Sequence, residues 1–153
     1  MPVALAPLAV ALAVVLVIAP FRAAAQWRPT GPLASVLVVD DCNETGGDVM
    51  VSRLDPPTVY VCPTVVSLVR KQHPGAENFF LVHEFGHIAL QTSDEAAADC
   101  WAAHELVGVR HGRRTLDAAI ALFRARADDA SGRYGSPRER AERIRRCAEE
   151  ALP

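Results

Sequence analysis

The stretch that decides the fold is AENFFLVHEFGHIAL, residues 76–90, with the pentapeptide HEFGH at its centre. Apolar side chains flank the pentapeptide and no proline interrupts the stretch, so it predicts a helix. Residues four apart on a helix share one face, so His83 and His87 can direct their imidazoles to one metal ion. Glu84 is rotated by about 100° from His83 and can reach a water on the open side of that ion. The pattern predicts metal-assisted hydrolysis with Glu84 as the catalytic base.

A catalytic zinc ion usually has three protein ligands and one open position, so we expect a third ligand downstream. The segment EAAAD, residues 95–99, places two carboxylates four apart on one helix face. Asp99 lies in an otherwise apolar stretch, where a carboxylate is costly unless it is paired. Glu95 has a competing interpretation, because Thr92 and Glu95 match a T-x-x-E capping box that would fold the glutamate back onto the backbone. In that case Asp99 would be the third ligand.

These two motifs resemble those of the gluzincin class of zinc metallopeptidases. The similarity is to the branch in which HExxH is followed by ExxAD, as in the prenyl-protein endopeptidases, and it covers residues 83–101. The linker at residues 88–94 is very short and the chain shows none of the transmembrane helices of the membrane endopeptidases. It therefore looks more like small exported metallopeptidase-like proteins, which also carry paired cysteines around a strand upstream of HExxH.

Carried over residue by residue, the resemblance implies a role for each polar residue of the two motifs. Glu84 would be the general base, and Asp99 would orient a ligand histidine without binding the metal. The zinc ligands would be His83, His87 and Glu95.

The remainder of the chain predicts an α+β domain, because strand patterns come first and helix patterns follow. Short β-branched runs indicate a small N-terminal sheet, whose strands cover residues 35–40, 49–54 and 58–62. Four to five helices are expected after it, between Pro63 and the break at 73–75 and over residues 76–90, 94–109, 116–127 and 137–152. With the resemblance, this order predicts a minimal zincin-like domain.

Length and composition limit the possibilities further. The chain has 153 residues, of which 50% are apolar and 22% charged, with a net charge of −2. These values suit one globular domain, exclude a disordered chain and give no indication of nucleic-acid binding. Residues 1–25 are apolar, uncharged before Arg22, and end in three alanines, which predicts a cleaved signal peptide and leaves residues 26–153 as the domain. An uncleaved membrane anchor is the alternative, since an apolar run of about 17 residues is at the lower limit for a span.

All four cysteines lie after the predicted signal peptide, an even number in a chain that we expect to be exported to a periplasmic or extracellular space. Of the three possible pairings, we predict Cys42 with Cys62, which flank a hairpin, and Cys100 with Cys147, which could join two helices. A cysteine zinc site is the alternative, but the chain contains no CxxC pair.

A peptidase also needs an oxyanion donor, and Tyr134 is the preferred candidate. His104 is expected to point away from the site, and His111 to lie at a solvated helix end beside three arginines. Trp27 and Trp101 are expected to be packing residues.

Two further segments have alternative interpretations. Residues 58–62 could be an edge strand to which an extended peptide adds by backbone pairing, or an internal strand of the sheet. The arginine-rich segment 138–146 is expected to be a salt-bridged helix surface and not a binding patch.

The sequence therefore predicts an exported, monomeric zinc peptidase that acts on peptides or unfolded protein segments and meets a membrane only if the leader is uncleaved. A first rival is a non-catalytic zinc-binding interaction or assembly module. A second is a metal-free domain held by two disulfides, in which His83 and His87 are incidental.

Overall fold

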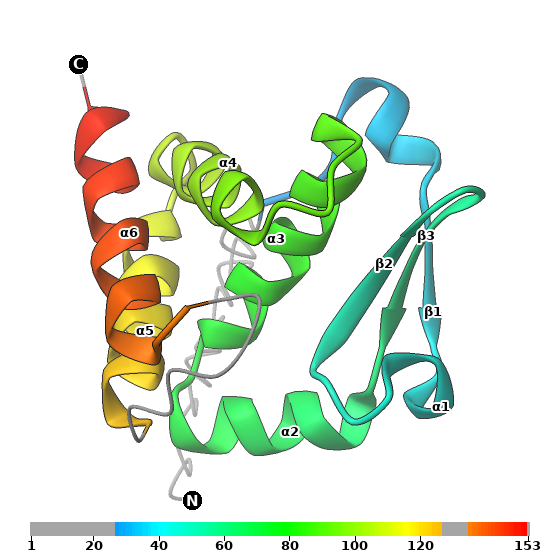
Figure 1. Cartoon of the computed structure of the whole chain (residues 1–153), viewed down its shortest axis with the longest axis horizontal. Helices are drawn as coiled ribbons and strands as arrows, with labels where there is room; N and C mark the ends of the chain where they lie inside the picture. The colour runs from blue at the N-terminus through cyan, green and yellow to red at the C-terminus, as the bar shows by residue number, and fades with distance from the viewer. Residues whose placement is uncertain (1–26, 127–134, 153) are drawn as a thin grey trace, which may run out of the picture.

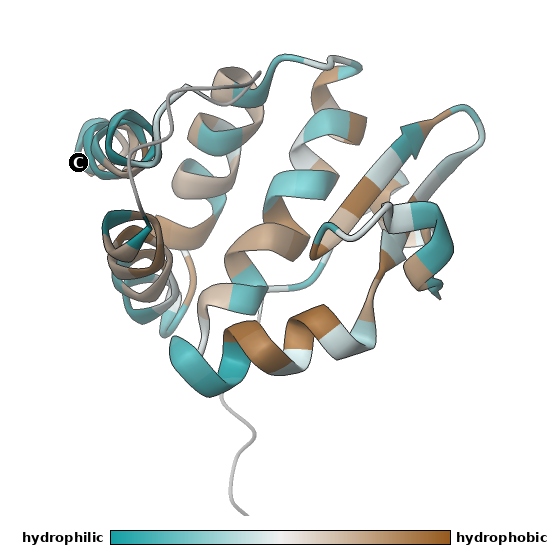
Figure 2. Ribbon diagram, turned by 60° about the horizontal axis from the view of Figure 1, so that its bottom comes forward, coloured by the Kyte–Doolittle hydropathy of each residue, from teal (hydrophilic) through white to brown (hydrophobic). Residues whose placement is uncertain are grey.

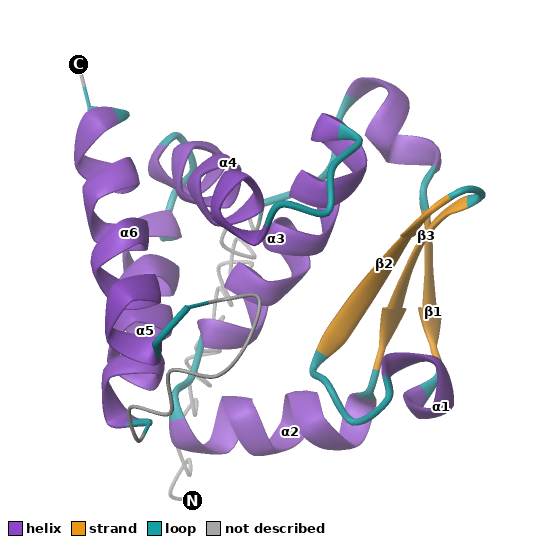
Figure 3. Cartoon of the chain, viewed as in Figure 1, coloured by secondary structure: helices purple, strands orange, loops and turns teal. Residues whose placement is uncertain are grey.

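The computed structural model describes residues 27–126 and 135–152 (Figure 1). The predicted signal peptide, residues 1–25, and the predicted oxyanion donor Tyr134 lie outside the described residues. Within them the strands gather on one side and the larger helices on the other (Figure 3), which confirms a small α+β domain. The elements are η1 Gly31–Ser35, β1 Leu37–Asp40, α1 Cys42–Thr45, β2 Met50–Leu54, β3 Pro57–Val61, α2 Pro63–Gln72, α3 Ala76–Leu90, α4 Glu95–Val107, α5 Gly112–Ala125 and α6 Pro137–Glu150.

The sheet has the strand order β1-β3-β2, with β1 parallel and β2 antiparallel to the central strand β3. The hairpin places β2 on one side of β3, and the one-turn helix α1 lets β1 pair on the other side. Of the two interpretations of residues 58–62, the edge strand is therefore wrong and the internal strand is correct. The edge strand that packs against α3 is β2.

Helix α3 lies between the sheet and helices α4, α5 and α6 and carries much of the core (Figure 1). Phe79, Val82 and Phe85 are almost completely buried, and Trp27 packs edge-on against Phe85 with the ring centroids 5.2 Å apart. Trp101 lies edge-on to Trp27, so both tryptophans are packing residues, as predicted. In Figure 2 hydrophilic residues cover much of the C-terminal helix α6, whereas apolar residues are prominent in β2.

Both predicted disulfides are present. Cys42–Cys62 joins the start of α1 to the residue after β3, and Cys100–Cys147 joins α4 to α6. Two disulfides fit an oxidising, exported environment. In residues 27–126 and 135–152, no helix has the length and apolar character needed to cross a membrane.

Candidate metal centre

Three buried side chains from α3 and α4 converge on one point. The Nε2 atoms of His83 and His87 are 3.1 Å apart, and Glu95 Oε2 lies 3.1 Å from the first and 3.4 Å from the second. Ligand atoms about 2.0–2.1 Å from a tetrahedral metal ion are separated by about 3.4 Å. The spacing therefore fits a common ion, and this group could hold one.

The local fold explains why Glu95 reaches the histidines. Helix α3 ends at Gln91, and the chain turns back into α4, whose N-cap is Asp94. The Asp94 carboxylate accepts hydrogen bonds from the amides of Ala96 and Ala97. Because Asp94 performs the capping, Glu95 is the first helical residue and its side chain can face α3. The capping-box alternative for Glu95 is therefore wrong.

A glycine allows the two helices to approach closely. A Cβ atom on Gly86 would lie 3.1 Å from the carbonyl oxygen of Ala98 and 3.1 Å from the Trp101 ring. A larger residue in the middle of α3 would push α4 outward. Gly86 thus helps to bring Glu95 within reach of the histidines.

The outer nitrogens of both imidazoles have hydrogen-bond acceptors. His87 Nδ1 donates to the Thr92 carbonyl at 2.9 Å, and His83 Nδ1 lies 2.9 Å from Asp99 Oδ1. A proton on each Nδ1 leaves each Nε2 with a lone pair toward the shared point. Asp99 thus lies against His83 and away from the shared point, which is the position that the resemblance implies for it.

Asp99 is completely buried and is held by two arginines of α6. Arg140 Nη2 donates to Oδ1 at 2.8 Å, and Arg143 Nη2 donates to Oδ2 at 3.0 Å. Burial would raise the pKa of the Asp99 carboxyl, but His83 and Arg140 lower it below its ordinary value. The Asp99 carboxylate is therefore charged, and His83, Arg140 and Arg143 all contact it.

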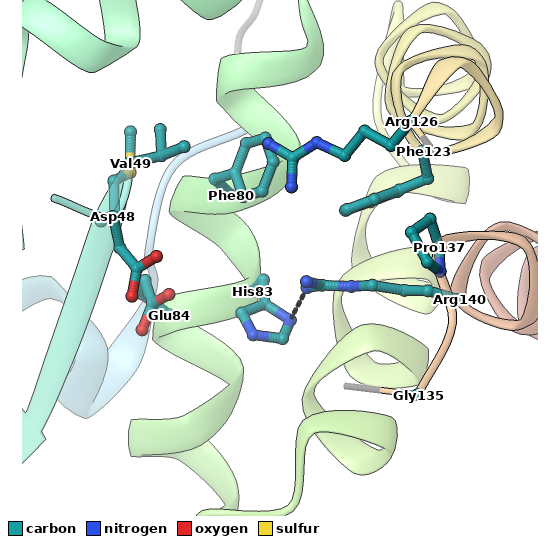
Figure 4. Close-up of a pocket in the computed structure, with 11 residues that line it drawn as sticks. Asp48, Val49, Phe80, His83, Glu84, Phe123, Arg126, Gly135, Pro137 and Arg140 are labelled. Carbon is teal, nitrogen blue, oxygen red and sulfur yellow. Dashed lines mark hydrogen bonds between the residues drawn. The ribbon is translucent and has the colours of Figure 1, made fainter. Parts of the chain in front are cut away.

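The prediction that residues 138–146 form only a salt-bridged surface is wrong for Arg140. The residue is 6% exposed, and its side chain stacks over Phe123 at 4.5 Å and extends to His83 (Figure 4). A signal was present in the sequence, because Arg140 shares a helical stripe with the buried Ile144 and Cys147. The surface interpretation is correct for Arg145, which pairs with exposed glutamates.

Glu84 lies beside the cluster and faces the sheet. Ser52 of β2 donates a hydrogen bond to Glu84 Oε2 at 2.8 Å. Burial raises the pKa of Glu84, although the nearby histidines and Ser52 oppose the shift. A raised pKa suits a carboxylate that must accept and return a proton near neutral pH.

The electrostatics of the three converging groups are complementary. Burial alone would raise the pKa of Glu95, but hydrogen bonds from His83 and His87 hold it at about 2. Burial would lower the pKa of His83, but Asp99 and Glu95 raise it above its ordinary value. Positive charge is therefore favoured where the three groups meet, and a bound cation would replace the protons there.

Two open hollows flank the cluster between β2 and α3. The larger, the His83 cleft, has a volume of about 210 Å³ and is walled by Phe80, Phe123 and Arg140 (Figure 4). The smaller, the His87 cleft, has a volume of about 100 Å³ and includes Ser52, Thr92 and Glu95. Glu84 lines both. The candidate base therefore stands where the two clefts meet.

The other predicted histidines lie outside this site. His104 is exposed on α4, and His111 is exposed at the N-terminal cap of α5. Neither lines either cleft.

Comparison of the chain with protein-family models, curated proteins and solved structures gives no match.

Proposed function

We propose that this protein is a zinc-dependent peptidase that acts on peptides or unfolded protein segments. The observation that carries the proposal is the convergence of His83, His87 and Glu95 on one point, with Glu84 beside them and open clefts on both sides. Two imidazoles and one carboxylate are the ligand set of many catalytic zinc sites. Such sites leave one position open for water or substrate.

Zinc bound there would polarise a scissile carbonyl and lower the pKa of the attacking water. Glu84 takes a proton from that water as its oxygen attacks the carbonyl carbon. When the carbon–nitrogen bond breaks, Glu84 delivers the proton to the leaving amine. Ser52 holds the Glu84 carboxylate in place, and Asp99 holds the His83 ring.

The substrate class follows from the edge strand. Among the described residues β2 pairs only with β3, so its other edge is open for an extended backbone. A chain that adds there would run along α3 and across both clefts. Phe80, Phe123 and Val49 give the His83 cleft apolar walls that would accept an apolar side chain next to the cleaved bond.

The location of the activity is part of the proposal. We infer that the leader directs export and that the protein works in a periplasmic or extracellular space. The two disulfides support this, because such bonds persist in oxidising compartments.

The test combines metal analysis with a peptide-cleavage screen. We expect one zinc per chain by elemental analysis, and loss of the metal in Glu95→Ala. Glu84→Gln should keep the zinc and lose turnover. Glu77→Gln is the matched control, because Glu77 lies on the same helix but pairs with Arg70 and lines neither cleft.

The outcomes separate the rivals. A zinc-loaded protein that cleaves no peptide of a diverse library would favour a non-catalytic zinc-binding module. A protein that takes up no metal, and whose melting temperature is unchanged by chelators, would favour a metal-free disulfide domain. Unchanged hydrolysis by Glu84→Gln would overturn the mechanism.

A further inference from the structure

The opposite face of α3 borders a third hollow, the back hollow, which is separate from the metal cluster. Its volume is about 350 Å³, and α3 contributes Asn78, Leu81 and Val82 to it. Asn78 and Val82 lie about 120–180° around the helix from Glu84 and His87, and Leu81 lies between the two faces. None of the three cluster residues lines the back hollow.

The interior of the back hollow is apolar. Trp27, Val82, Leu106 and Val109 line it together with Leu81. Pockets for small molecules in proteins have volumes of roughly 300–1,000 Å³ and mostly apolar linings with a few polar groups. The back hollow is at the small end of this range, so it would take a single short chain or ring.

The rim of the back hollow is cationic. Its charge comes from Arg110 and Arg114, which lie with His111 in the turn between α4 and α5 and in the first turn of α5. Within residues 27–126 and 135–152, no acidic side chain lines the hollow, and neither Arg110 nor Arg114 forms an ion pair. By contrast, Arg140 and Arg143 are both paired with the Asp99 carboxylate. The rim therefore favours an anion that the described residues do not supply.

The turn that carries Arg110 packs closely against the end of α4. A Cβ atom on Gly112 would collide with the backbone carbonyl of Leu106, so α5 starts in direct contact with the end of α4. His111 has a positive φ of 68° and gives α5 no side-chain cap. The amides of the first turn of α5 therefore lack a side-chain acceptor and lie beside the arginines.

We propose that the back hollow binds a small amphiphilic anion, with its apolar part among Trp27, Leu81 and Leu106 and its carboxylate or phosphate head on Arg110 and Arg114. Apolar walls alone would accept any hydrophobic molecule. The unpaired arginines at one end select for negative charge, since hydrogen bonds between guanidinium groups and oxyanions are about twice as strong as neutral ones. This site does not depend on the proposed peptidase activity.

The test is binding of decanoate and decyl phosphate to the purified full-length protein below their micelle concentrations. Trp27 is a built-in reporter, because it lines the hollow, whereas Trp101 does not. In a Trp101→Phe background, saturable binding of one molecule should change the Trp27 fluorescence, and calorimetry should give the same stoichiometry. Decyltrimethylammonium, with the same tail and the opposite charge, should bind at least tenfold more weakly.

The test variants remove arginines that line the back hollow, and the control variant removes a neighbouring arginine that does not. The double variant Arg110→Ala/Arg114→Ala should weaken binding of both anions at least tenfold. Arg113→Ala removes one positive charge, one fewer than the double variant, from the intervening position, which lines a different hollow beside Leu116, and should leave the affinity unchanged. The head group that binds more tightly, carboxylate or phosphate, identifies the class of anion that the back hollow takes.

Several outcomes would overturn the proposal. Equal affinity for the decyl cation would mean a merely hydrophobic site, and equal losses in Arg113→Ala would mean general charge attraction. Binding only to anionic phosphatidylglycerol vesicles and not to the free anions would mean a membrane surface contact. Glu84→Gln and zinc removal should leave anion binding unchanged. A failure of the peptidase proposal can therefore be distinguished from a failure of the anion site.

Discussion

The two sides of the candidate metal site, which is formed by His83, His87 and Glu95, are built from different kinds of contact. On the His83 side, the imidazole contacts the carboxylate of Asp99 on α4. Arg140 and Arg143 of α6 form ion pairs with that carboxylate. On the His87 side, the imidazole rests on the backbone carbonyl of Thr92, only five residues along the chain. One side depends on buried charges from three helices, and the other on a local turn.

The difference decides where the cluster is vulnerable. A backbone carbonyl cannot be removed by substitution, so the His87 side tolerates changes to its own supporting residue. The His83 side buries a carboxylate and a guanidinium, and removing one partner leaves the other as an uncompensated charge. We therefore expect mutations of similar size to have unequal effects on the two sides.

The largest difference is expected between Asp99→Ala and Thr92→Ala. Asp99→Ala leaves Arg140 buried without its carboxylate and should lower the free energy of unfolding by about 3–5 kcal/mol. Thr92→Ala keeps the carbonyl and loses the hydrogen bond from the Asp94 amide to Thr92 Oγ1, which is worth about 1 kcal/mol. Urea unfolding of the metal-free proteins measures both, and equal losses would contradict the comparison.

The disulfides offer the next contrast. Cys100–Cys147 joins the helices that carry Asp99 and Arg140 across 47 residues, whereas Cys42–Cys62 closes 20 residues near the sheet. Loop-closure entropy predicts losses of about 4 and about 3 kcal/mol when each pair is replaced by serines. Only the loss of Cys100–Cys147 should also weaken zinc binding, because it frees α6 from the His83 side. A zinc titration in which both double variants bind equally would refute this link.

A smaller effect is expected when the charge of Asp99 is removed but its shape is kept. Asp99→Asn should lower zinc affinity by about 10- to 100-fold, since carboxylates behind a ligand histidine fix the ring and raise its basicity. Thr92→Ser retains the carbonyl behind His87 and serves as the control, with an expected change below about twofold. Competition with a chromogenic chelator measures both affinities, and unchanged binding by Asp99→Asn would show that Arg140 and Arg143 suffice to order the His83 side.

The same contrast explains what could be predicted from the sequence. His83, Glu84, His87 and Glu95 are close in the chain and lie on two consecutive helices, so helical periodicity and motif spacing place them correctly. The α3 boundaries, Ala76–Leu90, match the prediction because a glycine precedes the helix and its apolar pattern is long. Local information is enough for the His87 side and for the three candidate metal ligands.

The contacts that were missed are those between distant segments. Arg140 lies 41 residues after Asp99, and only the packing of α6 against α4 brings them together. The position of β3 between β1 and β2 likewise depends on the parallel pairing of β1 with β3, which no short-range pattern encodes. The buried Asp99 did require a positive partner, but four other arginines in residues 138–146 were equally available by charge alone.

The smallest effect concerns Glu84, which stands between the two sides and lines both clefts. As a base, Glu84 must be ionised, so peptidase activity should fall as the pH decreases through its pKa, which burial has raised. The hydrogen bond from Ser52 favours the ionised form and lowers the pKa. Ser52→Ala therefore moves the acid limb of kcat/KM to higher pH.

A hydrogen bond worth about 0.5–1.5 kcal/mol corresponds to a roughly two- to tenfold loss of kcat/KM on the acid limb, with no change on the plateau above it. Ser93→Ala is the matched control, because Ser93 lines the same small cleft without a hydrogen bond to Glu84. An equal loss at every pH would mean that Ser52 positions the substrate and not the base. A shifted limb in Ser52→Ala but not in Ser93→Ala would identify Glu84 as the titrating group, because Ser52 donates its hydrogen bond to that carboxylate.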